Sequence, residues 1–524
     1  MTVQMASTPA LRYPGAYVAT AGTKPAIIVA ETGAAMSYAE LDAFAKRLGR
    51  FYHSMGIKPG EHVACCIENR LECMALQWGA HYAGLYYTFI SNRLTPGEAS
   101  YIVADCDAKV LVVTEKTAPG LVEAIKALPN PPKLLTLDAA TSDLLNLLDA
   151  INGHEATLIE GALEGSDMLY SSGTTGRPKG VKPALTGLPL GSTARIADLM
   201  QQGFGVSREA VYLSAMPYYH AASLKWFHGI TALGGTAVLM QKFDAEGSLA
   251  AIERYQVTHS QMVPTMFHRL LSLSLAARQC HDLSSLKVLV HAGAPCAIET
   301  KQRMIDWLGP IVAEYYSCTE AIGMTYSDSA GWLSHPGTVG RPLMGKLHIV
   351  DDAGHEVPTG AEGTVYFSDG PKFSYHKDEE KTRQAHNAAD WATVGDIGRV
   401  DADGYLYLTD RKNNMIISGG VNVYPQETEN VLIAHPKVFD VAVIGTPHED
   451  LGEEVRAVVQ LEPGVSPSAA LAQELIAYCR AHLSPIKSPR VVDFRDDLPR
   501  EPTGKLLKRL LRDEYRAKFL TEKK

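Results

Sequence analysis

Hydrophobic and polar positions follow two different periods along this chain. Residues 37–54 repeat apolar side chains such as Leu41, Ala45 and Leu48 at a spacing of three or four, which predicts an amphipathic helix. Short apolar and β-branched runs lie between such stretches, and each predicts a buried strand. Examples of these runs are 62–67, 109–113, 237–240 and 288–291. Helices that alternate with buried strands indicate an α/β fold with largely parallel sheets.

A change of pattern near residue 410 predicts two unequal domains. Turn signals at 369–371 and 401–404 precede the polar run 410–414. A second unit then begins with a strand at 415–418, a helix at 426–434 and a strand at 441–445. We expect a large N-terminal domain, 1–410, with stacked sheets and helices, and a small mobile α+β domain, 411–524. No fixed-period repeat is present, which excludes solenoids and propellers.

Composition and charge narrow the class of protein. The chain has 524 residues and a net charge of −9, so it lacks the overall basic balance typical of a nucleic-acid binder. Its eight cysteines form no CxxC pair, and we expect free thiols in a reducing compartment. No signal peptide and no apolar run long enough for a membrane span is evident. We therefore expect a cytoplasmic protein without nucleic acid as a partner.

The segment 167–181 carries the strongest local signal. A short apolar strand, 168–170, runs into a stretch with three glycines, four hydroxyls and a lysine. Glycines allow backbone N–H groups to converge on an anion, and hydroxyls and lysine add donors and charge, which suits a polyphosphate. Taken alone, a Gly-rich stretch is also compatible with a surface turn, and the run does not match GxxxxGK[ST]. The candidate contacts are Ser171, Ser172, Gly173, Thr174, Thr175, Gly176 and Lys179.

With this loop the sequence resembles the adenylate-forming superfamily of acyl- and aryl-CoA synthetases, luciferases and adenylation domains. The resemblance covers about residues 35–515, because further motifs follow in the family's order. They are the runs 216–220 (MPYYH), 291–295 (HAGAP), 316–320 (YSCTE), 337–342 (GTVGRP), 394–396 (VGD), 410–411 (DR), 418–420 (SGG) and 502–505 (PTGK). Each string is weak by itself, and their order carries the resemblance.

The resemblance implies an ATP site with Mg²⁺. Tyr316 would lie against adenine, Asp396 would bind the ribose hydroxyls with Arg411 beside it, and Glu320 with Thr174 would hold the metal, which prefers oxygen ligands. Read alone, a lone glutamate is commonly a solvated charge and Asp-x-Gly is commonly a turn. The remaining nucleotide contacts implied by the resemblance are Gly293, Tyr315, Thr319 and Lys505.

The acyl substrate would lie beside His220, although a lone histidine after an apolar run is also compatible with a core residue. The family usually has glycine where Ser317 stands, so its side chain would narrow the slot. Small residues after His220 suggest a tunnel for a long or bulky acid. The expected acyl contacts are His220, Ala222, Ala294, Pro295, Ser317 and Cys318, with Trp226 and Phe227 as further apolar candidates.

The small domain is expected to supply one group for each half-reaction. By resemblance the catalytic residues are Lys505, His220, Thr174 and Glu320. The positive charge of Lys505 would offset the repulsion between the substrate carboxylate and the α-phosphate of ATP. Ser418, Gly419 and Gly420 would contact coenzyme A, with glycines leaving room for its thin arm. Asn413 stands at the hinge, where the family commonly has aspartate or lysine.

We therefore expect an ATP- and Mg²⁺-dependent carboxylate–CoA ligase that acts through an acyl-adenylate on a medium- or long-chain fatty acid. An aryl- or steroid-type acid is an alternative. A carrier-loading adenylation domain lacks support, because no Phe-Asp-x-Ser string stands near His220 and no carrier domain is expected after Lys505. A luciferase-type oxygenase shares the motifs, and a non-catalytic nucleotide-binding protein would need no mobile lysine. The partners are ATP, CoA and a small carboxylic acid, and the expected state is a monomer or homodimer.

Overall fold

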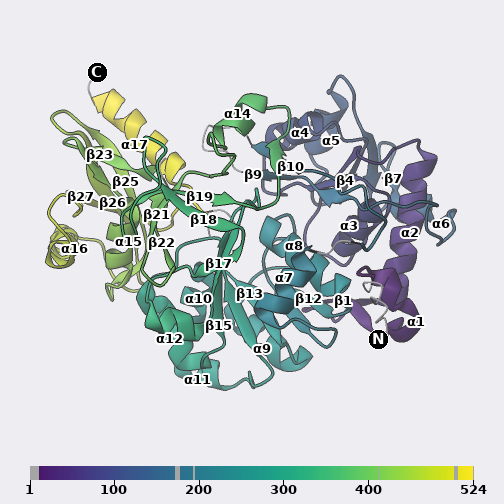
Figure 1. Cartoon of the computed structure of the whole chain (residues 1–524), viewed down its shortest axis with the longest axis horizontal. Helices are drawn as coiled ribbons and strands as arrows, with labels where there is room; N and C mark the ends of the chain where they lie inside the picture. Colours follow the sequence, from purple (N-terminus) through teal and green to yellow (C-terminus); the bar gives the residue numbers. More distant parts are fainter. Residues whose placement is uncertain (1–10, 172–177, 193–194, 412–413, 501–505, 523–524) are drawn as a thin grey trace, which may run out of the picture.

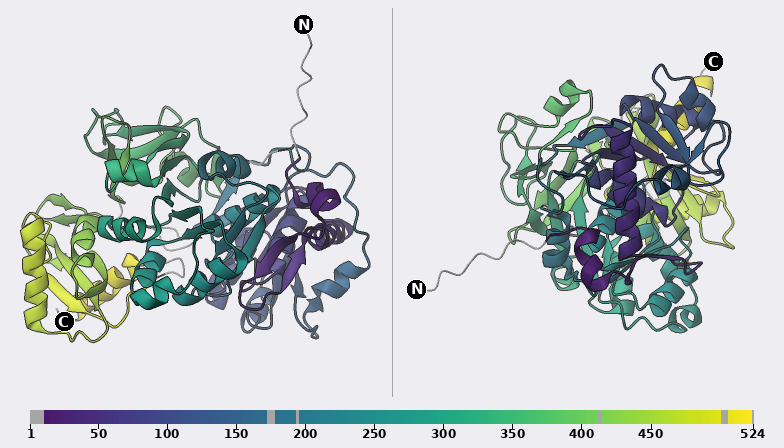
Figure 2. Two further views of the ribbon diagram at one scale, coloured as in Figure 1. Left: turned by 90° about the horizontal axis from the view of Figure 1, so that it is seen from below. Right: turned by 90° about the vertical axis from the view of Figure 1, so that its right-hand side faces the viewer.

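The computed structural model describes residues 11–171, 178–192, 195–411, 414–500 and 506–522. It confirms the α/β class and the division into a large N-terminal part and a smaller C-terminal part. Figure 1 shows the small part, coloured yellow-green, at one end of the molecule beside the green strands that precede it in the chain. Figure 2 shows the same separation from below.

The nine-stranded sheet forms the centre of the large part. Its middle strands run parallel, and the strands at its two edges pair antiparallel. In spatial order its members are β17 (Arg341–Met344), β16 (Met324–Ser327), β15 (Val312–Ser317), β14 (Val288–His291), β13 (His259–Met262), β11 (Val211–Ser214), β12 (Thr236–Leu239), β1 (Pro25–Val29) and β2 (Ala35–Ser37).

The second large sheet has six strands, all of which pair in parallel. Its order is β7 (Leu145–Asn146), β6 (Lys133–Thr136), β5 (Val110–Val113), β3 (His62–Cys66), β4 (Tyr86–Phe89) and β8 (Ser166–Asp167). The strands predicted from apolar runs are confirmed to within one or two residues, because buried parallel strands are apolar on both faces.

Two antiparallel sheets complete the large part. The three-stranded sheet contains β20 (Phe373–Tyr375), β10 (Lys179–Pro183) and β9 (Leu169–Ser171), and the four-stranded sheet contains β18 (Lys346–Val350), β19 (Gly363–Ser368), β21 (Asp396–Val400) and β22 (Leu406–Arg411). The sequence predicted one strand of each, the apolar run 168–170, which corresponds to β9, and the β-rich run 405–408, which corresponds to β22, but not their other strands. These strands are half-exposed, so the apolar pattern that marks a buried strand is weaker in them.

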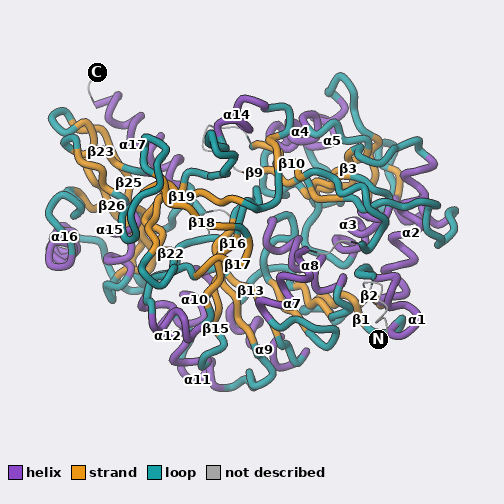
Figure 3. Tube along the Cα trace, in the orientation of Figure 1, coloured by secondary structure: helices purple, strands orange, loops and turns teal. Residues whose placement is uncertain are grey.

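Helices cover the sheets on both faces (Figure 3). In the large part they are η1 (Pro14–Tyr17), α1 (Val18–Ala21), α2 (Tyr38–Ser54), α3 (Glu72–Tyr82), α4 (Pro96–Asp105), α5 (Leu121–Lys126), α6 (Leu147–Asn152), α7 (Arg195–Phe204), α8 (Ala221–Ala232), α9 (Ala245–Tyr255), α10 (Pro264–Leu271), α11 (Leu275–Gln279), α12 (Ile298–Leu308), α13 (Ser329–Ser334) and α14 (Glu379–Gln384). The predicted helix at 37–54 corresponds to α2, and Ser37 caps it through a reciprocal pair of hydrogen bonds with Glu40.

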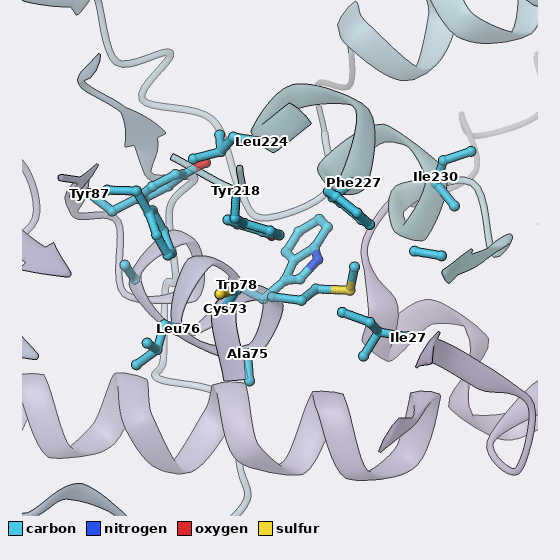
Figure 4. Packing of buried hydrophobic residues seen from close by; sticks show 14 of the residues in the cluster. Ile27, Cys73, Ala75, Leu76, Trp78, Tyr87, Tyr218, Leu224, Phe227 and Ile230 are labelled. Atoms are coloured by element: carbon cyan, nitrogen blue, oxygen red, sulfur yellow. The ribbon is translucent and has the colours of Figure 1, made fainter. Parts of the chain in front are cut away.

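The largest core joins side chains of α2, α3 and α8 to both large sheets. Trp78 of α3 is fully buried there and donates its indole N–H to Thr231 Oγ1 of α8 at 3.0 Å. Figure 4 shows Trp78 beside Tyr218 and Phe227. The contact between α3 and α8 therefore fixes how these two helices face the site described below.

The small part is built on its own core, which starts at Ile416. Its elements are β23 (Ile416–Ser418), β24 (Val421–Val423), α15 (Pro425–Ile433), β25 (Val438–His448), β26 (Gly452–Leu461), α16 (Ala469–His482), β27 (Val491–Phe494) and α17 (Lys508–Glu522). β25 and β26 form a long antiparallel pair, and β27 lies parallel to β26. The predicted strand, helix and strand at the start of this unit correspond to β23, α15 and β25.

Candidate active site

A cavity of about 2460 Å³ lies between the large and small parts. Residues from both parts line it, including Asn430 of α15 and Leu498. The sequence-predicted residues that line it are Ser171, Lys179, His220, Ala222, Trp226, Gly293, Ala294, Pro295, Tyr315, Tyr316, Ser317, Cys318, Thr319, Glu320, Asp396 and Arg411. The structure thus brings together residues that are up to 240 positions apart in the sequence, from Ser171 to Arg411.

The topology explains why these residues meet. β11, β13, β14 and β15 are parallel neighbours, so their carboxyl ends lie along one edge of the sheet, where ligands bind in open α/β sheets. Residues 293–295 follow β14, residues 317–320 end or follow β15, and His220 lies beyond β11. Gly293 has φ +83°, a conformation that glycine adopts without strain and that turns the chain along the cavity wall.

Tyr316, Asp396 and Arg411 form one hydrogen-bonded group. The Tyr316 hydroxyl donates to Asp396 Oδ2 at 2.5 Å, and Arg411 Nε donates to Asp396 Oδ1 at 3.0 Å. β21 and β22 create this contact, because Asp396 and Arg411 are directly paired across them. Burial and the nearby Asp396 carboxylate raise the pKa of Tyr316 well above its usual value, so its hydroxyl stays protonated and available as a donor.

Glu320 accepts a hydrogen bond from the Tyr375 hydroxyl at 2.8 Å. The carboxylate is only 9% exposed and lines the cavity. Lys179 Nζ lies 5.8 Å from the centre of the Tyr375 ring, and burial lowers the pKa of this lysine. Tyr375 therefore lies between Glu320, the carboxylate expected to bind the metal, and Lys179, the lysine expected to bind phosphate.

The candidate phosphate loop joins two paired strands. Ser171 of β9 pairs with Lys179 of β10, so the two ends of the loop lie side by side. Ser172, Gly173, Thr174, Thr175 and Gly176 lie outside the described residues, as do Asn413 and Lys505.

His220 is the residue immediately before α8, with extended backbone at φ −78° and ψ 140°. Its ring lies 4.7 Å from the ring of Tyr219. Ala222 and Trp226 of α8 line the cavity as predicted, whereas Phe227 does not. Phe227 is fully buried and stacks on Tyr218 at 5.2 Å. The prediction for Phe227 was wrong because its position on the helix points into the core between α3 and α8.

The small part contributes residues near its C-terminal end to the cavity wall. Leu498, Arg500, Leu506 and Lys508, which flank the segment containing Lys505, all line it. Two ion pairs fix the flanks: Arg500 with Asp440 at 2.6 Å, and Lys508 with Glu429 at 2.8 Å. In this arrangement the residues on either side of 501–505 line the cavity, and the residues of the β23–β24 turn do not.

Ser418, Gly419 and Gly420 do not line this cavity. They form the turn between β23 and β24, with φ +56° at Gly419 and +80° at Gly420. Their separation from the other predicted residues is compatible with the expectation that the small domain uses a second orientation for coenzyme A.

The structure adds residues that sequence reasoning missed. Tyr375 contacts Glu320, and Gln261 of β13 donates to the Tyr315 hydroxyl at 2.5 Å. Both line the cavity. Gln261 offered a weak signal, because a polar residue near the carboxyl end of a buried parallel strand is unusual. The sequence offered no signal for Tyr375, because this residue lies in a short half-exposed strand.

No helix in the part of the chain that the structure describes is long and apolar enough to span a membrane.

Comparison with known proteins places most of the chain in one family. The AMP-binding enzyme family matches residues 16–373, and the AMP-binding enzyme C-terminal domain matches residues 427–505.

Individual relatives resemble the chain over nearly its whole length. Long-chain-fatty-acid–CoA ligase FadD13 of Mycobacterium tuberculosis is 32% identical over 496 residues, which are 94% of this chain and 95% of that protein. Feruloyl-CoA synthase of an Amycolatopsis species is 33% identical over 502 residues, 94% of this chain and 96% of that protein. The structure of ATP-bound MatB from Rhodopseudomonas palustris is similar with a TM-score of 0.82 at 29% identity, covering 94% of this chain and 96% of that one.

Proposed function

Because this chain belongs to the AMP-binding enzyme family, we propose that it is a carboxylate–CoA ligase that works through an acyl-adenylate. The observation that carries this proposal is the cavity itself. It gathers the Tyr316–Asp396–Arg411 group, Glu320 and the flanks of the Lys505 segment around one space.

In the first half-reaction, a carboxylate oxygen of the acid attacks the α-phosphorus of ATP and pyrophosphate leaves. Tyr316 offers a flat face for adenine, and Asp396 can accept hydrogen bonds from the two ribose hydroxyls. Lys179 and Lys505 supply positive charge where two anions approach each other, which lowers the barrier electrostatically. We assign these roles on the chemistry of the residues and, for Tyr316, Asp396 and Lys179, on their common position at the cavity.

Mg²⁺ fits the residues present at the phosphate end. Glu320 provides a nearly buried carboxylate that Tyr375 orients by a hydrogen bond, and the hydroxyl of Thr174 would be the second protein ligand. When bound, the ion neutralises charge on the phosphates, and a hard cation of this kind needs few protein ligands.

In the second half-reaction, the thiol of coenzyme A attacks the acyl carbon, the thioester forms and AMP leaves. The turn at Ser418, Gly419 and Gly420 is the proposed contact with coenzyme A after the small domain rotates about Asn413. We place the boundary between the domains at residues 410 and 411, close to where β22 ends and before the separate core that starts at Ile416. The cytoplasm is the proposed location.

The acid has an apolar body in this proposal. Relatives named for a long-chain fatty acid and for ferulate differ in the shape of their acids, so we propose a medium- or long-chain fatty acid, with an aryl or steroid-like acid as the alternative. Trp226 and Ala222 on α8 line the space next to His220, which suits apolar groups of either kind.

Lys505→Ala tests this mechanism. We expect the variant to bind ATP with nearly the affinity of the wild type and to release pyrophosphate at least about 100-fold more slowly, because removal of one transition-state charge typically costs this much. Lys523→Ala removes a lysine from the C-terminal end and serves as the control. Pyrophosphate release at the wild-type rate by Lys505→Ala would overturn the assigned role. ATP binding without pyrophosphate release by the wild type, across a panel of acids, would favour a non-catalytic nucleotide-binding protein.

A further inference from the structure

One part of the cavity wall is more polar than a tunnel for a plain fatty acid requires. Gln77 and His81 of α3, Asp167 of β8, and Lys225 and His228 of α8 line it. We call these five residues the distal polar cluster. They come from three elements that the packing of α3 on α8 and the pairing of β4 with β8 bring together.

Two members of the cluster, Lys225 and His228, lie on α8, the helix that starts directly after His220. Lys225 and His228 follow His220 by five and eight positions, which is about 7 and 12 Å along the axis of a helix that rises 1.5 Å per residue. Ala221, Lys225 and His228 share one face of α8, and Leu224 and Trp226 also line the cavity. An acid whose carboxylate lies beside His220 would therefore pass apolar wall before its far end meets the cluster.

The two charged members of the cluster form a long ion pair without a direct hydrogen bond. Lys225 Nζ lies 3.8 Å from Asp167 Oδ2, and the two side chains are 28% and 19% exposed. This distance exceeds that of a hydrogen bond, so each partly buried group still gains from a better partner. A group that both accepts and donates would satisfy lysine and carboxylate together.

The two histidines are neutral at physiological pH. Burial lowers the pKa of His81 well below its usual value and that of His228 to about 4. The His228 ring stacks on Trp78 at 4.2 Å and meets the His81 ring at 4.9 Å. His81 is 7% exposed, and its Nδ1 has no hydrogen-bond partner within the described residues. Neutral imidazoles add hydrogen-bond donors and acceptors to this part of the cavity wall without adding charge.

The charges and hydrogen-bonding groups of the cluster favour one of three chemical groups at the far end of the acid. A methyl end would bury Lys225 and Asp167 without new partners, which is unfavourable. A second carboxylate would gain from Lys225 but would be repelled by Asp167 beside it. A hydroxyl can accept from Lys225 and donate to Asp167, and it carries no charge.

We propose that the acyl pocket takes a carboxylic acid whose apolar body ends in a hydroxyl group bound between Asp167 and Lys225. This inference rests on the proposed ligase function and specifies its substrate class. The hydroxyl belongs to an aliphatic chain or to a ring, and the body spans the distance from His220 to the cluster.

Matched pairs of acids test the proposal in the full-length enzyme. Decanoic acid is compared with its terminal-hydroxyl and terminal-carboxyl derivatives, and phenylpropanoic acid with its para-hydroxy derivative. Pyrophosphate release gives kcat/KM for each. We expect at least one hydroxylated acid to exceed its parent by about 10-fold or more, because a site that binds a hydroxyl discriminates against analogues that lack it. Equal values within both pairs, or a preference for the dicarboxylate, would overturn the proposal and leave the ligase function standing.

Variants then assign the preference to the cluster. Lys225→Met and Asp167→Asn should each reduce the hydroxyl preference towards one, and Lys225→Met should raise kcat/KM for the parent acid because the charge is gone. Lys242→Met, at an exposed position outside the cavity, should keep the wild-type preference. ATP affinity and thermal denaturation report on folding of each variant. A hydroxyl preference that survives in both cluster variants would contradict the assignment, whereas absence of pyrophosphate release with every acid would overturn the ligase function instead.

Discussion

At the scale of single residues, Asp396 connects most of the nucleotide end of the site. Its two carboxylate oxygens accept separately, from Tyr316 and from Arg411. The motif around it indicated a ribose contact by resemblance, and the structure adds that the same carboxylate fixes the ring proposed to face adenine. Loss of the Asp396 charge would therefore affect both proposed contacts with ATP, the one with the ribose and the one with adenine.

Asp396→Asn should raise KM for ATP by roughly 10- to 100-fold, which corresponds to the loss of charge-assisted hydrogen bonds. It should also reduce the preference of the enzyme for ATP over its 3′-deoxy analogue, because that preference depends on the ribose hydroxyl. Steady-state kinetics with both nucleotides provide the measurement. Asp390→Asn is the control, since Asp390 is exposed and asparagine tolerates its positive φ. An unchanged preference in Asp396→Asn would show that this carboxylate does not bind the ribose.

His62 gives a second prediction at this scale, concerning stability. Its ring stacks on Tyr86 at 4.8 Å, and burial, assisted by the positive charge of Lys182, lowers its pKa to about 3. Below pH 6.5 the unfolded chain takes up a proton that the folded protein does not, so stability present above that pH is lost progressively down to about pH 3. At pH 5 this loss is about 2 kcal/mol relative to neutral pH.

His62→Phe keeps a ring for the stack and removes the titration. We expect its urea denaturation midpoint to fall less between pH 7 and pH 5 than that of the wild type. His355→Asn, at a side chain that is 80% exposed, should fall as much as the wild type. The interpretation is wrong if the His62 variant and the wild type respond to pH equally.

At the scale of elements, local signals decided where helices begin. Ser37 and Glu40 form a reciprocal cap at the start of α2, with Glu40 Oε2 accepting from the Ser37 N–H at 2.8 Å. Such a cap is readable in sequence because it needs only residues three positions apart. The half-exposed strands β19 and β21 lacked a comparable signal, since their pairing depends on partners distant in the chain.

Ser37→Ala should lower the free energy of unfolding by about 1 kcal/mol, because one N–H at the helix start loses its acceptor. Thermal or urea denaturation of the full chain measures this change. Ser37→Thr retains a hydroxyl and should lose much less. Equal losses in the two variants would mean that packing, and not the cap, sets the contribution of this residue.

At the scale of the whole molecule, the small domain contributes to the cavity on one side only. The flanks of the Lys505 segment line the cavity, and the turn at Gly420 does not. Under the proposed mechanism, this arrangement suits adenylation, and thioester formation would require the small domain to move. The hinge prediction at Asn413 lies outside the described residues and stays a prediction.

Gly420→Leu should leave acyl-adenylate formation near the wild-type rate and abolish most of the thioester formation, because the side chain would occupy space proposed for the arm of coenzyme A. Gly464→Leu is a matched control, since both glycines have φ near +80° to +90° and open surroundings. The two half-reactions are followed separately by pyrophosphate release and by thioester yield. If both variants lose the second half-reaction equally, backbone strain explains the loss, and if neither does, the turn does not contact coenzyme A.

The sequence alone determined the α/β class, the division into a large and a smaller part and the order of the motifs, because periodicity, caps and short motifs depend on neighbouring residues. It also indicated sixteen of the residues that line one cavity. Only the tertiary structure decided which faces of α3 and α8 meet that cavity, since this depends on how two helices far apart in the chain pack together. That packing buried Phe227. Contacts between other segments distant in the chain placed Tyr375 beside Glu320 and Asp167 near Lys225, two charged residues of the cavity wall that the sequence did not predict as contacts of the acid.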